Sequence, residues 1–145
     1  MTERFLEYPL DKLLSEGTKF VVDQELQIVS QIRIEETTII EQQHFPDQEY
    51  GVLMVLLRWY PNYAPLEELQ SALTGRSVER CRRDINRAFD EGEGDGVMRP
   101  IRNVISRLRV KVHAFEIDAR SIIETGYLLM PDRTSKYSKR TAQPL

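Results

Sequence analysis

Hydrogen-bonding and cationic side chains are concentrated between residues 99 and 113. On a helix, one face of this segment would carry the polar residues Arg99, Arg102, Asn103, Ser106, Arg107, Arg109 and Lys111. A guanidinium group can pair bidentately with guanine and a carboxamide with adenine, while further cations contact phosphates. The pattern therefore suits the major groove of DNA. The alternative is an ordinary surface helix with solvated arginines, and charge alone does not separate the two.

Two elements must position these side chains. The first is a helix over about residues 100–113, where Pro100 suits the first turn. Its buried stripe is Ile101, Val104, Ile105, Leu108 and Val112. The second is a hairpin of two short strands around Thr125–Gly126. Thr125 and Tyr127 are its candidate DNA contacts, although packing on the core is the favoured role for Tyr127.

A competing basic helix is predicted from Ser77 to about Asp90. Its apolar stripe is Val78, Cys81, Ile85, Ala88 and Phe89, and another face carries Arg80, Arg83 and Arg87. This face is the alternative surface for DNA or for a protein partner. The segment EGEGDG, residues 91–96, reads as a turn or loop. As a DNA-contacting wing it would be repelled by phosphate.

The remaining elements form a scaffold. The short apolar pattern in residues 1–16 predicts one or two helical turns. Four short antiparallel strands are expected at 18–22, 26–30, 32–34 and 37–41. A helix of about 13 residues should begin near Asp47 and stop at Pro61, followed by a short helix from Pro65 to Gly75.

Charge is distributed unevenly along the 145 residues, whose net charge is −3. Residues 1–50 hold 4 Lys/Arg and 11 Asp/Glu, residues 51–98 hold 6 and 8, and residues 99–145 hold 10 and 4. The C-terminal third is therefore basic and the N-terminal third acidic. DNA affinity depends on local phosphate neutralisation, so this asymmetry is compatible with DNA binding.

Several functional classes lack support. One cysteine and two distant histidines make no metal-site pattern, and no nucleotide-binding or serine-nucleophile motif occurs. The longest apolar run, Val52–Leu57, is far shorter than the roughly 20 residues of a membrane span. We therefore expect a cytoplasmic protein that is not an enzyme, with no cofactor and no metal.

Three short motifs resemble the OmpR/PhoB class of winged helices. The first two helices of that class match Phe45, Glu49, Glu67, Glu68, Leu69 and Gly75. Its recognition-helix hallmark matches Ile105, Ser106, Leu108, Arg109, Lys111 and Val112. The end of its wing matches Gly126, Tyr127 and Leu129. The resemblance covers about residues 45–130, and the strands at 18–44 fit the family's N-terminal sheet only loosely.

The resemblance implies an α+β winged helix-turn-helix with an N-terminal antiparallel sheet, a three- to four-helix core and a C-terminal β-hairpin wing. The expected divisions are an extension and sheet at 1–44, the winged helix at 45–131 and a flexible basic tail at 132–145. The sequence carries no receiver domain, so it is similar to stand-alone or ToxR/CadC-like members, although no membrane helix follows. The segment 76–98 is longer than in the family, where this region contacts polymerase.

The resulting expectation is a transcription regulator that binds double-stranded DNA, with the helix at 100–113 in the major groove. RNA polymerase or another regulator is a further partner that the resemblance implies, and dimers on paired half-sites leave a homodimer open. The alternative is a winged helix that binds a protein partner, as a regulatory partner or anti-regulator, with weak or no DNA affinity.

Overall fold

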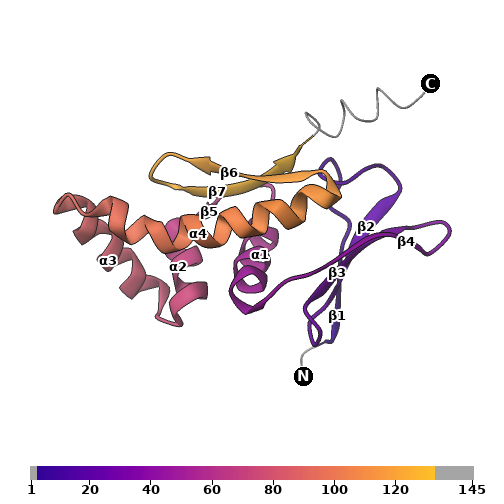
Figure 1. Ribbon diagram of the computed structural model, residues 1–145, viewed down its shortest axis with the longest axis horizontal. Coiled ribbons are helices and arrows are strands. Elements are labelled where there is room, and N and C mark those ends of the chain that lie inside the picture. Colours follow the sequence, from indigo (N-terminus) through magenta and orange to yellow (C-terminus); the bar gives the residue numbers. More distant parts are fainter. Residues whose placement is uncertain (1–2, 133–145) are drawn as a thin grey trace. The chain divides into compact units, whose positions relative to one another are not determined.

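A computed structural model describes residues 3–132 (Figure 1). The predicted basic tail lies, from residue 133 on, outside the described residues. The chain divides into two compact units. Of the described residues, the first unit comprises 3–46, Arg109–Asp118 and 130–132, and the second comprises Asp47–Leu108 and Ala119–Leu129. The described fold is α+β, with an antiparallel four-stranded sheet, four α-helices and a hairpin sheet.

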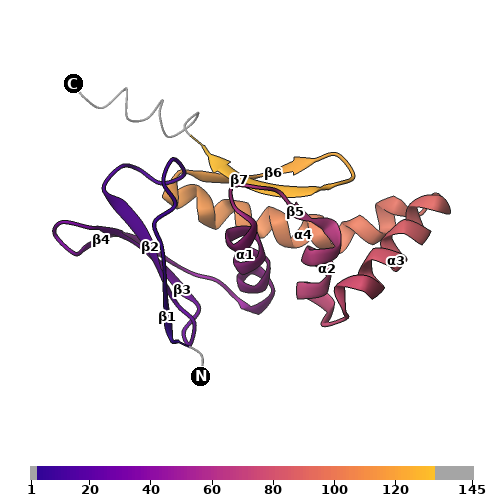
Figure 2. The same cartoon turned by 180° about the vertical axis from the view of Figure 1, so that it is seen from behind.

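The first unit contains the expected antiparallel sheet. Its strands are β1 (Phe5–Tyr8), β2 (Thr18–Asp23), β3 (Ile28–Arg33) and β4 (Thr38–His44), paired in chain order (Figures 1 and 2). Alternate residues of β2 are buried, as its period-two pattern requires. The ring of Phe20 meets that of Phe115 edge-on, with centroids 4.8 Å apart. This contact lies in the core of the unit.

Two sequence predictions in this unit are wrong. The strands expected at 26–30 and 32–34 are a single strand, β3, because the polar residues at its centre find hydrogen-bond partners in the first unit. The amide of Gln31 donates to Ser15 and Thr18, and Ser30 accepts a hydrogen bond from Gln42. The helical turns expected in residues 1–16 are instead the strand β1, which pairs with β2, and an irregular segment that buries Leu13 and Leu14.

The first three helices of the second unit form where they are predicted. They are α1 (Asp47–Trp59), α2 (Leu66–Thr74) and α3 (Val78–Asp90), with the short strand β5 (Ala64–Pro65) before α2. Gly75 closes α2 with a left-handed φ of 77°, and the Ser77 side chain caps α3 by accepting from the Arg80 amide. Capping and turn residues thus set the helix boundaries.

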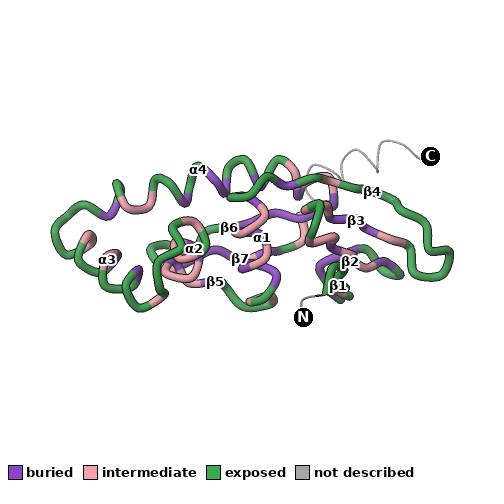
Figure 3. Tube along the Cα trace, turned by 90° about the horizontal axis from the view of Figure 1, so that it is seen from below, coloured by how far each residue is buried: buried purple, intermediate pink, exposed green. Residues whose placement is uncertain are grey.

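The fourth helix, α4 (Gly94–Val112), begins six residues before the predicted start. The predicted loop 91–96 is therefore wrong in its second half, and Pro100 lies inside the helix. Gly94 explains the error: a Cβ there would overlap the ring of Phe89, so this glycine allows close packing. The buried stripe of α4 is confirmed, and Figure 3 shows buried and exposed positions alternating along the helix.

The predicted hairpin is also confirmed. A 3₁₀ turn (His113–Phe115) follows α4 and leads into β6 (Ile117–Ile122) and β7 (Gly126–Pro131), which join β5 in the order β5-β7-β6. Ala64 pairs with Tyr127 and Pro65 with Gly126. No helix in residues 3–132 has the length and apolar character needed to cross a membrane.

Candidate nucleic-acid interface

The second unit presents one polar face of α4. It combines four of the predicted cations and amides with a hydroxyl, all exposed: Arg99, Arg102, Asn103, Ser106 and Arg107. The opposite face of the same helix is buried through Ile101, Val104, Ile105 and Leu108. Packing of the apolar stripe therefore holds these polar side chains on one side, at the three- and four-residue spacing of helix neighbours.

Asp95, on the first turn of α4, binds two of these arginines. Its carboxylate lies 2.7 Å from Arg102 and 3.1 Å from Arg99. Hydrogen bonds from Arg102 and then Arg99 hold the pKa of Asp95 below its ordinary value. All three side chains are largely exposed, so the pairs are weak and a competing phosphate can replace the carboxylate.

Arg107 is held differently, by an acid on α1. Its Nε donates to Glu49 at 3.1 Å, and a terminal nitrogen approaches Gln48 Oε1 at 3.5 Å. The Glu49 side chain is only 7% exposed, whereas Arg107 is 51% exposed. One edge of the guanidinium thus anchors α4 to α1, while the rest of the group faces solvent. Arg107 therefore has a partly structural role within the second unit.

Arg109 and Lys111, also predicted to bind DNA, belong to the first unit. There, Arg109 forms a bidentate pair with Asp118, at 2.8 and 3.3 Å. Lys111 donates to the backbone carbonyl of His44 at 3.0 Å, with its ammonium group 5.7 Å from the centre of the Phe45 ring. Both head groups are therefore engaged within their own unit.

We expect Arg109→Ala to lower the free energy of unfolding by about 2 kcal/mol while leaving DNA affinity nearly unchanged. The variant removes one cation from Asp118, whose side chain is 5% exposed, and loss of a cationic partner is costly for a buried carboxylate. His113, 3.3 Å from the same carboxylate, limits the loss. Urea denaturation measures the effect. Arg83→Ala, on an exposed face of α3, is the control. Unchanged stability with lost DNA binding would instead place Arg109 at the nucleic acid.

Of the two hairpin residues predicted to contact DNA, only one has an accessible side chain. The Thr125 hydroxyl donates to the carbonyl of Ile123, and the Thr125 carbonyl accepts from the Leu66 amide. Tyr127 is only 6% exposed, which agrees with the packing role favoured from the sequence. Among the candidate hairpin residues, Thr125 is thus the more accessible.

The alternative basic face on α3 is diluted by acids. Arg80, Arg83 and Arg87 are exposed, but Asp84 lies 3.9 Å from Arg87 and 3.3 Å from Arg76. Arg82 pairs with Glu67 at 3.1 Å. On α3 the acids lie among the arginines, whereas the one acid of α4, Asp95, lies on its first turn beside Arg99 and Arg102.

The acidic partners of the arginines are the site residues that the sequence does not reveal. Asp95 could have been recognised by its spacing of four and seven residues from Arg99 and Arg102, had α4 been extended to residue 94. Glu49 lies 58 positions from Arg107, and only the tertiary fold joins them.

Among residues 3–132, no three His, Cys, Asp or Glu side chains are grouped to hold a metal ion. Comparison with protein-family models, curated proteins and solved structures finds no match to this chain. A function must therefore be inferred from the chain's own residues.

Proposed function

We propose that this protein binds double-stranded DNA through a winged helix-turn-helix, with α4 in the major groove. The observation that carries the proposal is the exposed face of Arg102, Asn103 and Ser106 on a helix whose other face is fully buried. A helix of this kind fits the major groove with its side chains against base edges.

The order of elements supports the same function. The chain order is a four-stranded sheet, three helices, and then α4 followed, after a short 3₁₀ turn, by a hairpin, which is also the order expected for the winged helices that the sequence resembles. The strand β5 pairs with β7 and so fixes the hairpin to the helical part of the second unit. A hairpin fixed in this way stays beside the helix that would enter the groove, as in a winged helix.

The exposed side chains of α4 are proposed to take two roles, base recognition and phosphate contact. Arg102 and Asn103 are the base readers, because a guanidinium and a carboxamide make the bidentate pairs that distinguish guanine and adenine. Ser106 lies one turn further along the same face. Arg99 and Arg107 serve phosphates, which position the protein without reading sequence.

The direct test is a titration of the full chain against fragments of its source genome at 50 and 200 mM salt. If about four phosphates are neutralised, affinity should fall about 100-fold between the two concentrations. Tight binding with no salt dependence, or no binding at 50 mM salt, would contradict the proposal.

We expect Asp95→Ala to tighten DNA binding about threefold at neutral pH, because it frees Arg99 and Arg102 from a competing carboxylate. The lowered pKa of Asp95 means that the carboxylate is ionised at neutral pH and is neutralised only as pH falls through that lowered value. The carboxylate is therefore ionised at pH 7 and at pH 5 alike, so the gain in affinity of the variant should be the same at both pH values. Fluorescence anisotropy with a selected DNA fragment measures both effects.

The matched control is Glu91→Ala, which removes an exposed acid near the start of α4. It changes net charge equally, so an equal gain in affinity would show a general charge effect and no specific role for Asp95.

A second candidate function is a protein-interaction module with weak DNA affinity. The hairpin turn favours it: Ile123 is 85% exposed, and the acidic Glu124 follows it. Neither side chain suits a phosphate backbone. Absence of DNA binding at 50 mM salt would select this alternative.

A further inference from the structure

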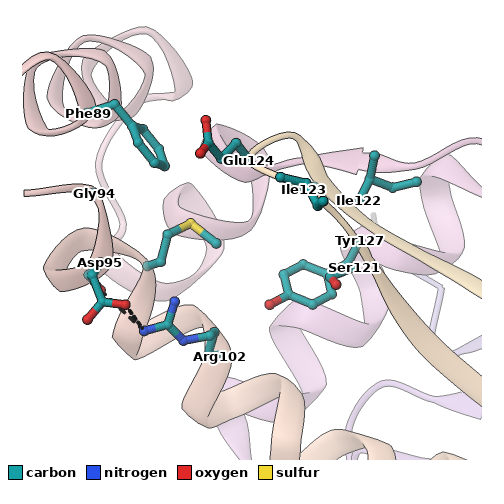
Figure 4. Close-up of a pocket in the computed structure, with 11 residues that line it drawn as sticks. Phe89, Gly94, Asp95, Arg102, Ser121, Ile122, Ile123, Glu124 and Tyr127 are labelled. Carbon is teal, nitrogen blue, oxygen red and sulfur yellow. Dashed lines mark hydrogen bonds and ion pairs between the residues drawn. The ribbon is translucent and has the colours of Figure 1, made fainter. Parts of the chain in front are cut away.

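A cavity of about 310 Å³ lies within the second unit, between the end of α3, the first turns of α4 and the hairpin tip (Figure 4). Its walls are mostly apolar and come from all three elements: Phe89, Met98, Ile122, Ile123 and Tyr127. Ligand cavities begin at about this size, so it has room for one compact apolar group.

Apolar surface continues outside the cavity. Ile123 at the rim is 85% exposed and Ile122 is 40% exposed. A small molecule in the cavity would contact Ile123 on one side only, whereas a protein chain can insert one side chain and also cover the rest of the rim. Apolar residues around a pocket of this kind mark protein-binding sites, where one buried anchor supplies much of the affinity.

The charged lining residues define the chemistry beside the anchor. Arg102 is the cation of the lining, and Asp95 already binds it at 2.7 Å. Glu124, at the hairpin tip, is an exposed carboxylate on the other side of the cavity (Figure 4). A partner cation next to the anchor would therefore meet Glu124, and the aromatic wall of Phe89 also favours a cation.

We propose that this cavity docks a protein segment in which a large apolar side chain, best an aromatic one, is flanked by basic residues. The aromatic group enters between Phe89, Met98 and Ile123, and the neighbouring cation pairs with Glu124. Arg102 belongs both to the lining of the cavity and to the proposed DNA face, but the docking contacts are those of Phe89, Met98, Ile123 and Glu124. The hairpin tip would then contact a protein partner, while the exposed face of α4 serves DNA.

The test uses the full chain with ¹³C-labelled methionine methyl groups. Of the four methionines, Met98 lines the cavity, while Met54 and Met130 lie elsewhere and act as internal references. The probe is the peptide acetyl-Lys-Trp-Lys-amide, compared with acetyl-Gln-Trp-Gln-amide, acetyl-Lys-Ala-Lys-amide and free indole. We expect the first peptide to shift the Met98 methyl signal selectively, the glutamine peptide to bind about threefold more weakly, and the alanine peptide to cause no shift.

Two variants and a control complete the design. Ile123→Ser should weaken the first peptide about fivefold. Glu124→Gln should remove the preference for lysine over glutamine, and Ile39→Ser, at another exposed isoleucine, should change nothing.

The proposal is overturned if the Met98 methyl signal does not shift, or if the alanine peptide shifts it equally. It is also overturned if free indole binds as well as the peptide and Ile123→Ser has no effect, which would indicate a small-molecule site. DNA affinity of Ile123→Ser, measured in parallel, should stay at the wild-type value, so failure here is distinct from failure of the DNA proposal.

Discussion

Arg102→Ala combined with Asn103→Ala is expected to weaken binding to a selected DNA fragment about 100-fold or more. Each bidentate contact between a side chain and a base edge contributes about 1–3 kcal/mol of discrimination, and the double variant removes two such groups from the exposed face of α4. Neither side chain belongs to the buried stripe, so folding should be preserved. Fluorescence anisotropy gives the affinity, and circular dichroism checks the fold.

The control is Arg83→Ala combined with Asn86→Ala on α3. It also removes one guanidinium and one carboxamide from exposed helix positions, three residues apart. If this pair abolishes binding and the α4 pair does not, the reading helix is α3. Arg107 is left intact in both variants because its loss would leave the buried carboxylate of Glu49 without this cation, and a stability defect would then obscure the DNA effect.

Gly126→Ala is expected to lower the free energy of unfolding by about 3 kcal/mol. The Cβ of an alanine here would overlap the carbonyl oxygen of Ala64, which belongs to the backbone of β5 and cannot rotate away. The strands β5 and β7 must separate, and the hairpin loses its attachment to the helices. Urea denaturation measures the loss.

Gly96→Ala provides the comparison, because it places the same methyl group in open space on the first turns of α4. Alanine favours helix over glycine, so this variant should gain about 0.5 kcal/mol. Equal stabilities for the two variants would show that the close approach at Gly126 is relieved at little cost.

The sequence predicts best those elements whose signals are local. The first three helices are marked by helical spacing together with Pro61, Gly75 and Ser77, and the hairpin is marked by Thr125–Gly126. Errors occur where distant contacts decide. The strand β1 exists because it pairs with β2, with Phe5 opposite Asp23. Gly94 is helical because it packs on Phe89, which a reading based on glycine as a loop former does not anticipate.

In the candidate site too, local features are predictable from the sequence and distant contacts are not. The exposed residues of α4 follow from helical periodicity, since Arg102, Asn103 and Ser106 lie opposite the apolar stripe. The acidic partner of each arginine cannot be predicted from helical periodicity. Asp118 binds Arg109 after a reversal of the chain, and Glu49 binds Arg107 from another helix. Periodicity thus predicts which side chains are accessible, and only the fold separates those that are free to meet a ligand from those already committed.

Pro100 within α4 has a consequence for local unfolding. Proline has no amide hydrogen, so the carbonyl of Gly96 lacks its usual partner four residues on. The turn at 94–99 is joined to the rest of the helix by fewer hydrogen bonds and can open while residues 101–108 stay folded. Amide hydrogen exchange should then show a sharp boundary at Pro100, with fast exchange before it and strong protection from Val104 to Leu108. The wall of the cavity formed by Asp95 and Met98 would belong to the part of the helix that opens first.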